Sequence, residues 1–205
     1  MSVNITKLFR SAEETETPEV AIVQGKLPEW VAGTYYRVGP AKFDFKDFTM
    51  NHMLDGYAMI AKFDITPERV TFQKKYLQSD SYKRAIAAQR PVITEFGTPA
   101  CSDPNKSLFS KFVTALMPEF SDNDYSTLLK IGPDLFSICD TCYFRQVDTQ
   151  ALGNSPEKYD SNKLFGVNGQ SAHPLTDSNG DVWNIGFTFF PGLKYQVVRV
   201  PNGKS

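Results

Sequence analysis

The sequence has few histidines and cysteines and no long apolar run. It contains only 2 histidines and 3 cysteines among 205 residues. Imidazole is the commonest nitrogen ligand for a catalytic transition metal, so a metal centre in this chain has few such ligands available. No run reaches the roughly 18 apolar residues that a membrane-spanning helix needs, which excludes a transmembrane helix of ordinary length.

The sequence also lacks an excess of charge of one sign. Lysine and arginine number 22 against 23 acidic residues, and no basic tract is present. We therefore expect no nucleic-acid partner. Residues 1–10 have no apolar core long enough for a secretory signal, although Lys7 and Arg10 leave organelle targeting open. An odd cysteine number without a signal fits a reducing compartment, so we expect a cytoplasmic protein or alternatively a mitochondrial one. That the protein is peripheral to membranes is an expectation from the segment over 103–117, described below.

The C-x-x-C spacing of Cys139 and Cys142 is formally that of a zinc or redox motif. Such motifs need a second cysteine pair or a following helix. Neither is present, and the surrounding sequence is typical of strands. We interpret the pair as structural.

Aromatic and turn-forming residues are abundant, with 16 Phe, 9 Tyr, 13 Gly and 13 Pro. This composition favours strands separated by turns. Alternation over 57–65, a turn at 66–69 and an apolar return over 70–78 predict a β-hairpin. Other strands are predicted at 20–30, 33–40, 127–131, 135–138, 143–147, 182–189 and 195–200.

Many short strands between turns indicate an all-β sandwich, barrel or propeller. No linker rich in Pro, Gly or Ser divides the chain. We therefore predict an irregular polar lead-in over 1–19, followed by one domain over 20–205.

Two helices interrupt the predicted strands. A short one is expected near 82–89. A second, over 103–117, has Asp103 as a plausible N-cap and Pro104 as its first helical residue. Its apolar positions recur at helical spacing and include Leu108, Phe109, Phe112 and Leu116. This face either packs on the core or dips into the outer leaflet of a membrane.

His173 lies in residues 165–177, between a run of small residues and a proline. Pro174 biases the residue before it toward extended geometry, which suits a rigid ligand. A single histidine near a turn is nevertheless more often structural than functional. The rest of the sequence must decide between these two interpretations.

Four short motifs favour a functional role for His173 over a structural one. They are residues 36–40 (YRVGP), 51–56 (NHMLDG), 92–98 (VITEFGT) and 172–174 (AHP). Their order and intervals resemble those of the carotenoid cleavage oxygenases, and the resemblance extends from about residue 20 to residue 200. Residues 87–90 (AAQR) and 198–201 (VRVP) are most similar to the animal enzymes that cut carotenoids eccentrically.

The resemblance implies a seven-bladed β-propeller, of which this chain would be the N-terminal part with a short helical insertion. In the family, four histidines hold a ferrous ion, Fe(2+), on the propeller axis. His173 corresponds to the first of the four, and the other three lie further along the family's chains. His52 falls in a family motif that does not bind iron, so we interpret His52 and Asp55 as structural.

Two further features follow from the resemblance. Asp140 occupies the position of a family glutamate that accepts a hydrogen bond from a ligand histidine, but it is one methylene shorter. Its partner would be a later histidine, so we expect none in this chain. Residues 103–117 correspond to the segment that contacts membranes and admits lipophilic substrate. Asn105 replaces a cysteine that often follows the Asp-Pro pair, so acylation there is lost.

The implied function is a non-haem iron dioxygenase that inserts dioxygen across one double bond of a carotenoid, giving apocarotenal products. An aromatic-lined tunnel would hold the polyene beside the iron. With one ligand histidine, this chain is expected to be inactive alone. Two alternatives stay open: a non-catalytic carotenoid- or retinoid-binding protein, and a retinoid isomerohydrolase-like member in which iron polarises an ester.

Overall fold

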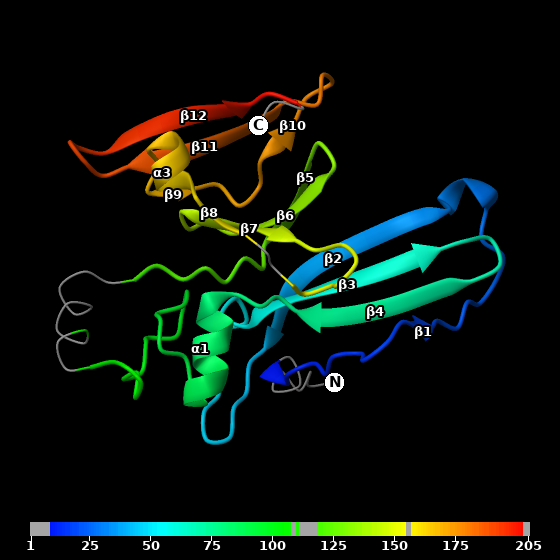
Figure 1. Ribbon diagram of the computed structural model, residues 1–205, viewed down its shortest axis with the longest axis horizontal. Helices are drawn as coiled ribbons and strands as arrows, with labels where there is room; N and C mark the ends of the chain where they lie inside the picture. The colour runs from blue at the N-terminus through cyan, green and yellow to red at the C-terminus, as the bar shows by residue number, and fades with distance from the viewer. Residues whose placement is uncertain (1–8, 108–109, 111–118, 155–156, 203–205) are drawn as a thin grey trace, which may run out of the picture.

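The computed structural model describes residues 9–107, 110, 119–154 and 157–202, and these form three four-stranded antiparallel sheets. Figure 1 shows the sheets following one another along the chain, with the third uppermost and the first lowest. The predicted all-β class is confirmed, since the helices within the described residues are few and short.

The first sheet contains β1 (Glu19–Val20), β2 (Gly33–Lys42), β3 (Tyr57–Ile65) and β4 (Val70–Tyr76), in the order β1-β4-β3-β2. The predicted hairpin is confirmed, with Ile65 opposite Val70 at its turn. The strand predicted over 20–30 is reduced to β1. The Ala21 N–H donates to the Val70 carbonyl, where β4 begins, so the chain beyond has no strand left to pair with.

The second sheet contains β5 (Thr127–Ile131), β6 (Asp134–Ile138), β7 (Tyr143–Val147) and β8 (Lys158–Asp160), in that order. The first three strands match the prediction. Gly132 takes a φ of +56° in the turn between β5 and β6, a conformation that glycine adopts without steric cost. β8 was not predicted, because its three residues are too few to show a period.

The third sheet contains β9 (Gly169–Gln170), β10 (Leu175–Thr176), β11 (Val182–Thr188) and β12 (Lys194–Val200). The two long strands confirm the prediction. β9 and β10 both pair with β11 along the edge opposite β12, so together they form one interrupted edge strand. The interruption is residues 171–174, which include His173.

The short helices are α1 (Asp80–Ala88), a 3-10 turn at Glu29–Val31, and α3 (Ser161–Phe165). The helix predicted near 82–89 is confirmed and begins earlier, because Ser79 caps it by accepting a hydrogen bond from the Tyr82 N–H. Residues 103–107 of the second predicted helix form a turn, in which Asp103 Oδ1 accepts from the Asn105 N–H at 2.8 Å. The predicted apolar positions Leu108, Phe109, Phe112 and Leu116 lie outside the described residues.

Among the described helices, none has both the length and the apolar character needed to cross a bilayer.

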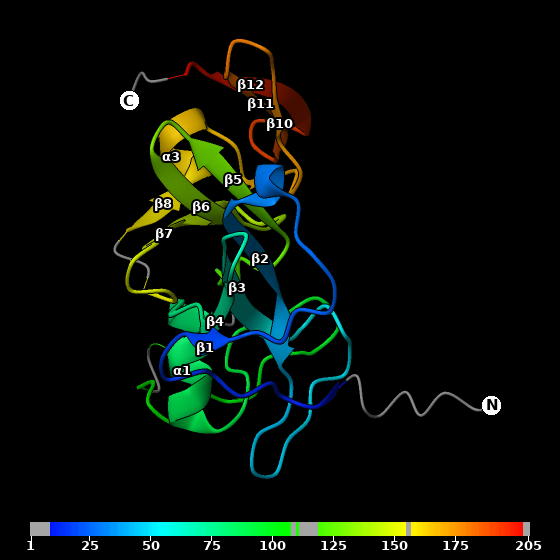
Figure 2. The same ribbon diagram turned by 90° about the vertical axis from the view of Figure 1, so that its right-hand side faces the viewer.

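The edges of the three sheets lie close together. β2, an edge strand of the first sheet, packs against β5, an edge strand of the second. β5 in turn contacts the interrupted edge of the third sheet through a hydrogen bond between Thr127 and His173. Figures 1 and 2 show the remaining strands of each sheet extending away from this region. Open sheets that radiate from neighbouring edges have the arrangement of successive propeller blades.

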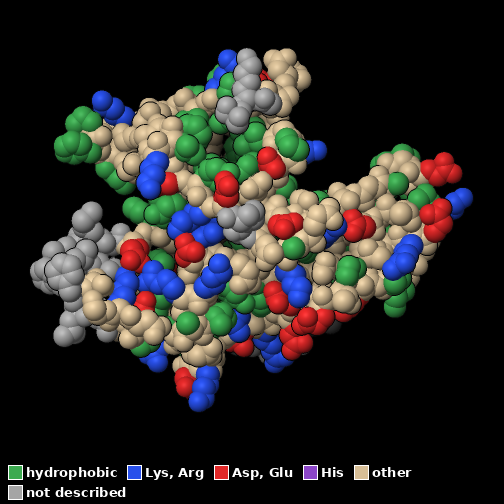
Figure 3. Space-filling view, viewed as in Figure 1, with side chains coloured by type: hydrophobic (Ala, Val, Ile, Leu, Met, Phe, Trp, Pro, Cys, Tyr) green, Lys and Arg blue, Asp and Glu red, His purple; other side chains and the backbone are tan. Residues whose placement is uncertain are grey.

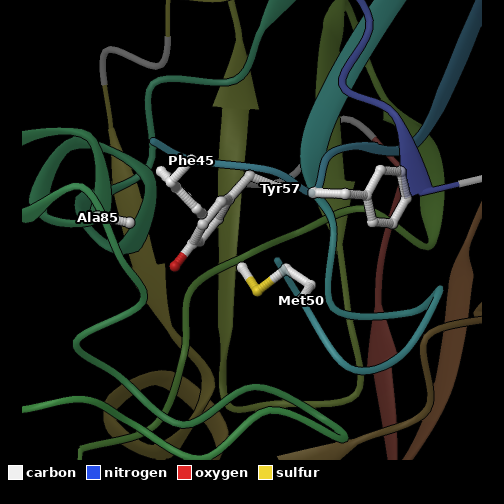
Figure 4. Close-up of a cluster of buried hydrophobic side chains, with 5 residues drawn as sticks. Phe45, Met50, Tyr57 and Ala85 are labelled. Atoms are coloured by element: carbon white, nitrogen blue, oxygen red, sulfur yellow. The ribbon is translucent and has the colours of Figure 1, made fainter. Parts of the chain in front are cut away.

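The core is divided among local clusters. One joins β3, α1 and the loop after β2, where Tyr57 is fully buried with Phe45, Met50 and Ala85 (Figure 4). Burying each large side chain contributes on the order of 1.5–3 kcal/mol. Other clusters lie between the first and second sheets and between the second and third. The relative positions of the sheet edges therefore depend on packing between sheets.

Candidate metal-binding edge and buried acidic network

His173 lies where the second and third sheets meet. Its side chain is exposed, and its Nδ1 is 3.1 Å from Oγ1 of Thr127, the first residue of β5. Its backbone N–H donates to Ser171 Oγ at 3.1 Å. The imidazole is therefore oriented by the neighbouring sheet and by its own loop.

This contact has a consequence for the ring nitrogens. When Nδ1 carries the proton and donates to Thr127, Nε2 presents a lone pair. No protein atom in the described part of the chain is hydrogen-bonded to Nε2 of His173. A hydrogen bond at one ring nitrogen and a free lone pair at the other is the arrangement of a metal-ligating histidine.

The described residues do not by themselves form a complete metal site. Within 9–107, 110, 119–154 and 157–202, no group of three or more His, Cys, Asp or Glu side chains could hold an ion. The Cys139 and Cys142 thiols are buried in the β6–β7 connection, and burial raises the pKa of both. His173 is thus a single candidate ligand, and its surroundings do not fit a finished iron centre.

Asp140 holds the loop that carries His173. Its Oδ1 accepts a hydrogen bond from the Ala172 N–H at 3.0 Å, and its carbonyl accepts one from the Gln170 N–H at 3.4 Å. The expectation that Asp140 lacks a histidine partner in this chain stays a prediction, and the structure adds a backbone partner that the sequence did not suggest. The sequence suggested a side-chain partner, whereas the carboxylate bonds the backbone immediately before His173.

Two of the four sequence motifs bind each other. The Asp55 carboxylate accepts hydrogen bonds from the His52 N–H at 2.9 Å, the Gly97 N–H at 2.6 Å and Thr98 Oγ1 at 2.5 Å. Nδ1 of His52 accepts from the Leu54 N–H at 3.1 Å. Residues 51–56 and 92–98 therefore form one hydrogen-bonded structure, and both His52 and Asp55 act within it.

Sequence reasoning missed a buried acidic network between the first and second sheets. Its centre is Asp122, which accepts hydrogen bonds from the Ser81 N–H at 2.9 Å, at the start of α1, and from the guanidinium of Arg145 on β7. Burial alone would raise the pKa of Asp122, but the hydrogen bonds from Arg145 and Ser81 outweigh it and lower that pKa. Asp122 therefore links α1, through Ser81, to the second sheet, through Arg145.

For two other acids of the network, Glu95 and Asp124, burial prevails and the pKa is raised. Glu95 is only 8% exposed, and burial raises its pKa to about 8, although Ser121 Oγ donates to it at 2.8 Å. Asp124 is fully buried, and neither of its carboxylate oxygens has a hydrogen-bond partner among the described residues. Burial raises the pKa of Asp124 well above its ordinary value. Both side chains therefore favour the protonated form.

A set of ion pairs lies at the two ends of residues 107–118. Arg84 of α1 pairs with Asp103 at 3.0 Å and with Glu119 at 2.6 Å. Lys106 pairs with the same glutamate at 2.7 Å. The chain therefore enters and leaves this segment at one place beside α1.

These observations describe a propeller-type β protein with an imidazole at the meeting edges of two sheets. The sequence matches the family described as Retinal pigment epithelial membrane protein over residues 8–205, and the chain belongs to that family. This match confirms the membership that the four sequence motifs predicted, in the family of the carotenoid cleavage oxygenases.

Named relatives are dioxygenases. The chain is 37% identical over 202 residues to a mitochondrial carotenoid-cleaving dioxygenase of Mustela putorius furo, covering 98% of this chain and 37% of that protein. It is 38% identical over 197 residues to a beta,beta-carotene 15,15'-dioxygenase of Rattus norvegicus, covering 94% of this chain and 35% of that protein. The chain thus spans just over a third of the length of these relatives.

Solved structures share the fold. An apocarotenoid oxygenase from Synechocystis superposes with a TM-score of 0.67 at 18% identity, covering 95% of this chain and 44% of that one. A cobalt-substituted form of the Synechocystis protein also gives 0.67 at 18% identity, covering 96% and 44%. At this identity the likeness establishes the fold.

Proposed function

We propose that this chain forms the N-terminal part of a carotenoid dioxygenase whose complete domain is a seven-bladed β-propeller. In this proposal His173 is one of four histidines that hold Fe(2+) on the propeller axis. The observation that carries it is the environment of the ring: Nδ1 faces Thr127, Nε2 has no protein partner in the described residues, and sheet edges meet there. Membership of a family with named carotenoid dioxygenases supports it.

The bound iron would supply the site at which dioxygen is activated beside the polyene. Both oxygen atoms of dioxygen enter the products as one carbon–carbon double bond becomes two carbonyl groups. The residues of this chain contribute position. Thr127 fixes the ring of His173, and Asp140 fixes the backbone before it through the Ala172 N–H. Both contacts limit rotation of the ligand, which favours a defined metal geometry.

The proposed membrane contact is residues 103–117, whose apolar positions at helical spacing include Leu108, Phe109, Phe112 and Leu116. Support comes from their spacing and from the ion pairs of Arg84, which hold both ends of the segment at α1. The name of the Mustela putorius furo relative, a mitochondrial dioxygenase, supports a mitochondrial location over the cytoplasmic one.

We further propose that this polypeptide is inactive alone, since it contains only 2 histidines. The test is iron analysis of the purified chain together with chromatography of products after incubation with carotenoid and Fe(2+). We expect neither one iron per chain nor apocarotenal aldehydes. Turnover with stoichiometric iron would refute the proposal.

A second candidate function is non-catalytic binding of a carotenoid or retinoid, and a large apolar cavity between the second and third sheets favours it. Retained lipid binding, without further ligand histidines encoded downstream of Ser205, would support this candidate. A retinoid isomerohydrolase-like activity is separated from the dioxygenase by its products in a chain with the complete ligand set. The dioxygenase gives aldehydes, whereas the isomerohydrolase gives isomers of retinol.

A further inference from the structure

A cavity of about 740 Å³ lies between the second and third sheets. Figure 3 shows a hollow rimmed by hydrophobic side chains in the upper part of the molecule. Its apolar walls come from both sheets and include Leu129, Phe136, Phe144, Val182, Val198 and Val200. Small-molecule sites in proteins commonly enclose about 300–1,000 Å³ and are mainly apolar. The volume and lining are therefore those of a ligand site.

Three aromatic rings form one wall of the cavity. Phe144 and Tyr159 stack with ring centroids 5.1 Å apart. Phe136 meets them edge-on, at 5.8 Å and 5.7 Å. These mutual contacts hold the rings in place without an occupant, so the wall is preformed. Aromatic faces and edges offer dispersion contact to hydrocarbon along their whole length.

The polar side chains of the lining already have partners within the protein. These pairs are Asp134 with Gln146, Tyr159 with Glu157, Gln170 with Ser161, Asn184 with Ser171, and Arg199 with Asp181. A charged or strongly polar ligand would have to break one of these pairs to be satisfied. Burying an unsatisfied polar group is costly, so the cavity selects against such ligands.

The cavity is distinct from the imidazole edge. Pro174 and Gln170 line it, whereas His173 does not. The ring that we propose as an iron ligand is therefore not part of the cavity lining.

We propose that this cavity binds an uncharged hydrocarbon chain, either the straight chain of a lipid or a branched isoprenoid. The apolar lining of this partly open cavity faces water, and a hydrocarbon would replace that water with dispersion contacts. This inference shares its cavity with the second candidate function, lipid binding, and does not depend on the proposed dioxygenase function. It requires neither iron nor a complete propeller.

The test is titration of the purified chain with aminoanthracene, a neutral fluorophore that brightens in apolar surroundings. Hexadecanol and farnesol then serve as competitors. We expect saturable binding of one fluorophore per chain and displacement by at least one alcohol. Displacement by hexadecanol alone identifies a straight chain, and displacement by farnesol alone identifies an isoprenoid. Absence of saturable binding, or failure of both alcohols to displace, would overturn the proposal.

Substitutions at two neighbouring valines on β12 test whether the ligand binds in this cavity. Val198 lines the cavity, whereas Val197 does not and is 68% exposed. We expect Val198→Trp to weaken binding by about tenfold or more, because the indole occupies the ligand's volume. The matched Val197→Trp variant should bind as the wild type does. Equal affinity in the two variants would overturn the location.

Circular dichroism establishes whether Val198→Trp is folded. If it is not, a diazirine derivative of the displacing alcohol is photo-crosslinked to the wild-type chain and the labelled peptides are mapped. Labels on β5, β6, β11 and β12 support the site. Labels confined to other segments contradict it.

Discussion

Glu95→Gln should remove a marked pH dependence of stability. Glu95 is buried beside Ser121, and its pKa is raised from 4.5 to about 8, chiefly by burial. The unfolded chain ionises this group near pH 4.5, whereas the folded protein keeps it protonated to about pH 8. Between these values the folded state binds more protons than the unfolded state. The free energy of unfolding therefore falls as the pH rises.

The magnitude follows from proton linkage. One such group lowers the free energy of unfolding by about 1.4 kcal/mol for each pH unit between its two pKa values. Its stabilising contribution is complete below the unfolded pKa of 4.5 and is lost as the pH rises toward about 8. From roughly pH 5.5 to 7.5 the wild type should lose about 2–3 kcal/mol more than Glu95→Gln. Glutamine keeps an oxygen to accept from Ser121 but cannot ionise.

The assay is urea unfolding followed by tryptophan fluorescence at a series of pH values. Glu119→Gln serves as the control, because ion pairs with Lys106 and Arg84 lower the pKa of Glu119 despite partial burial. A lowered pKa produces its pH dependence in acid, so this variant should parallel the wild type over the same range. Parallel curves for the wild type and Glu95→Gln would refute the assignment of a retained proton to Glu95.

Three further changes test other parts of the structure. Asp140→Ala should cost about 1–3 kcal/mol in urea unfolding, because it removes a partly buried hydrogen bond from the Ala172 N–H to a carboxylate; no loss would contradict that role. Gly97→Ala should destabilise by about 1–3 kcal/mol, since its new Cβ would lie 2.6 Å from the His52 Cβ; an unchanged Tm would contradict the close contact. Phe109→Glu with Phe112→Glu should weaken partition into liposomes without changing circular dichroism. Unchanged partition would instead favour packing of that face on the core.

The long strands could be predicted from the sequence because their signals are local. The alternation over 57–65 and the turn at 66–69 specify the hairpin of β3 and β4, and the structure contains it. By contrast, β9 and β10 have two residues each, too few to show a period. They exist because β11 supplies an edge for them. Their position, and hence that of His173, depends on tertiary pairing.

The candidate site shows the same division between local and distant information. The family motifs identified His173 as the residue to examine, but they could not identify Thr127 as its partner, 46 positions earlier in the chain. The sequence did not suggest the Ala172 N–H as a partner for Asp140, since backbone hydrogen bonds leave no mark on residue identity. The buried network around Asp122 was missed because its members come from separate elements and look like ordinary surface acids in sequence.

The most direct test of the account uses imidazole NMR. Because the chain has only 2 histidines, nitrogen-15 labelling gives one ring signal set for His173 and one internal control, His52. Nδ1 of His52 accepts from the Leu54 N–H, within the turn bound by Asp55. Anaerobic addition of Fe(2+) should broaden the His173 ring signals first, with Nε2 most affected, and His173→Ala should abolish the effect. Earlier broadening of His52, or equal broadening of both rings, would contradict the assignment of His173 as the metal-binding side chain.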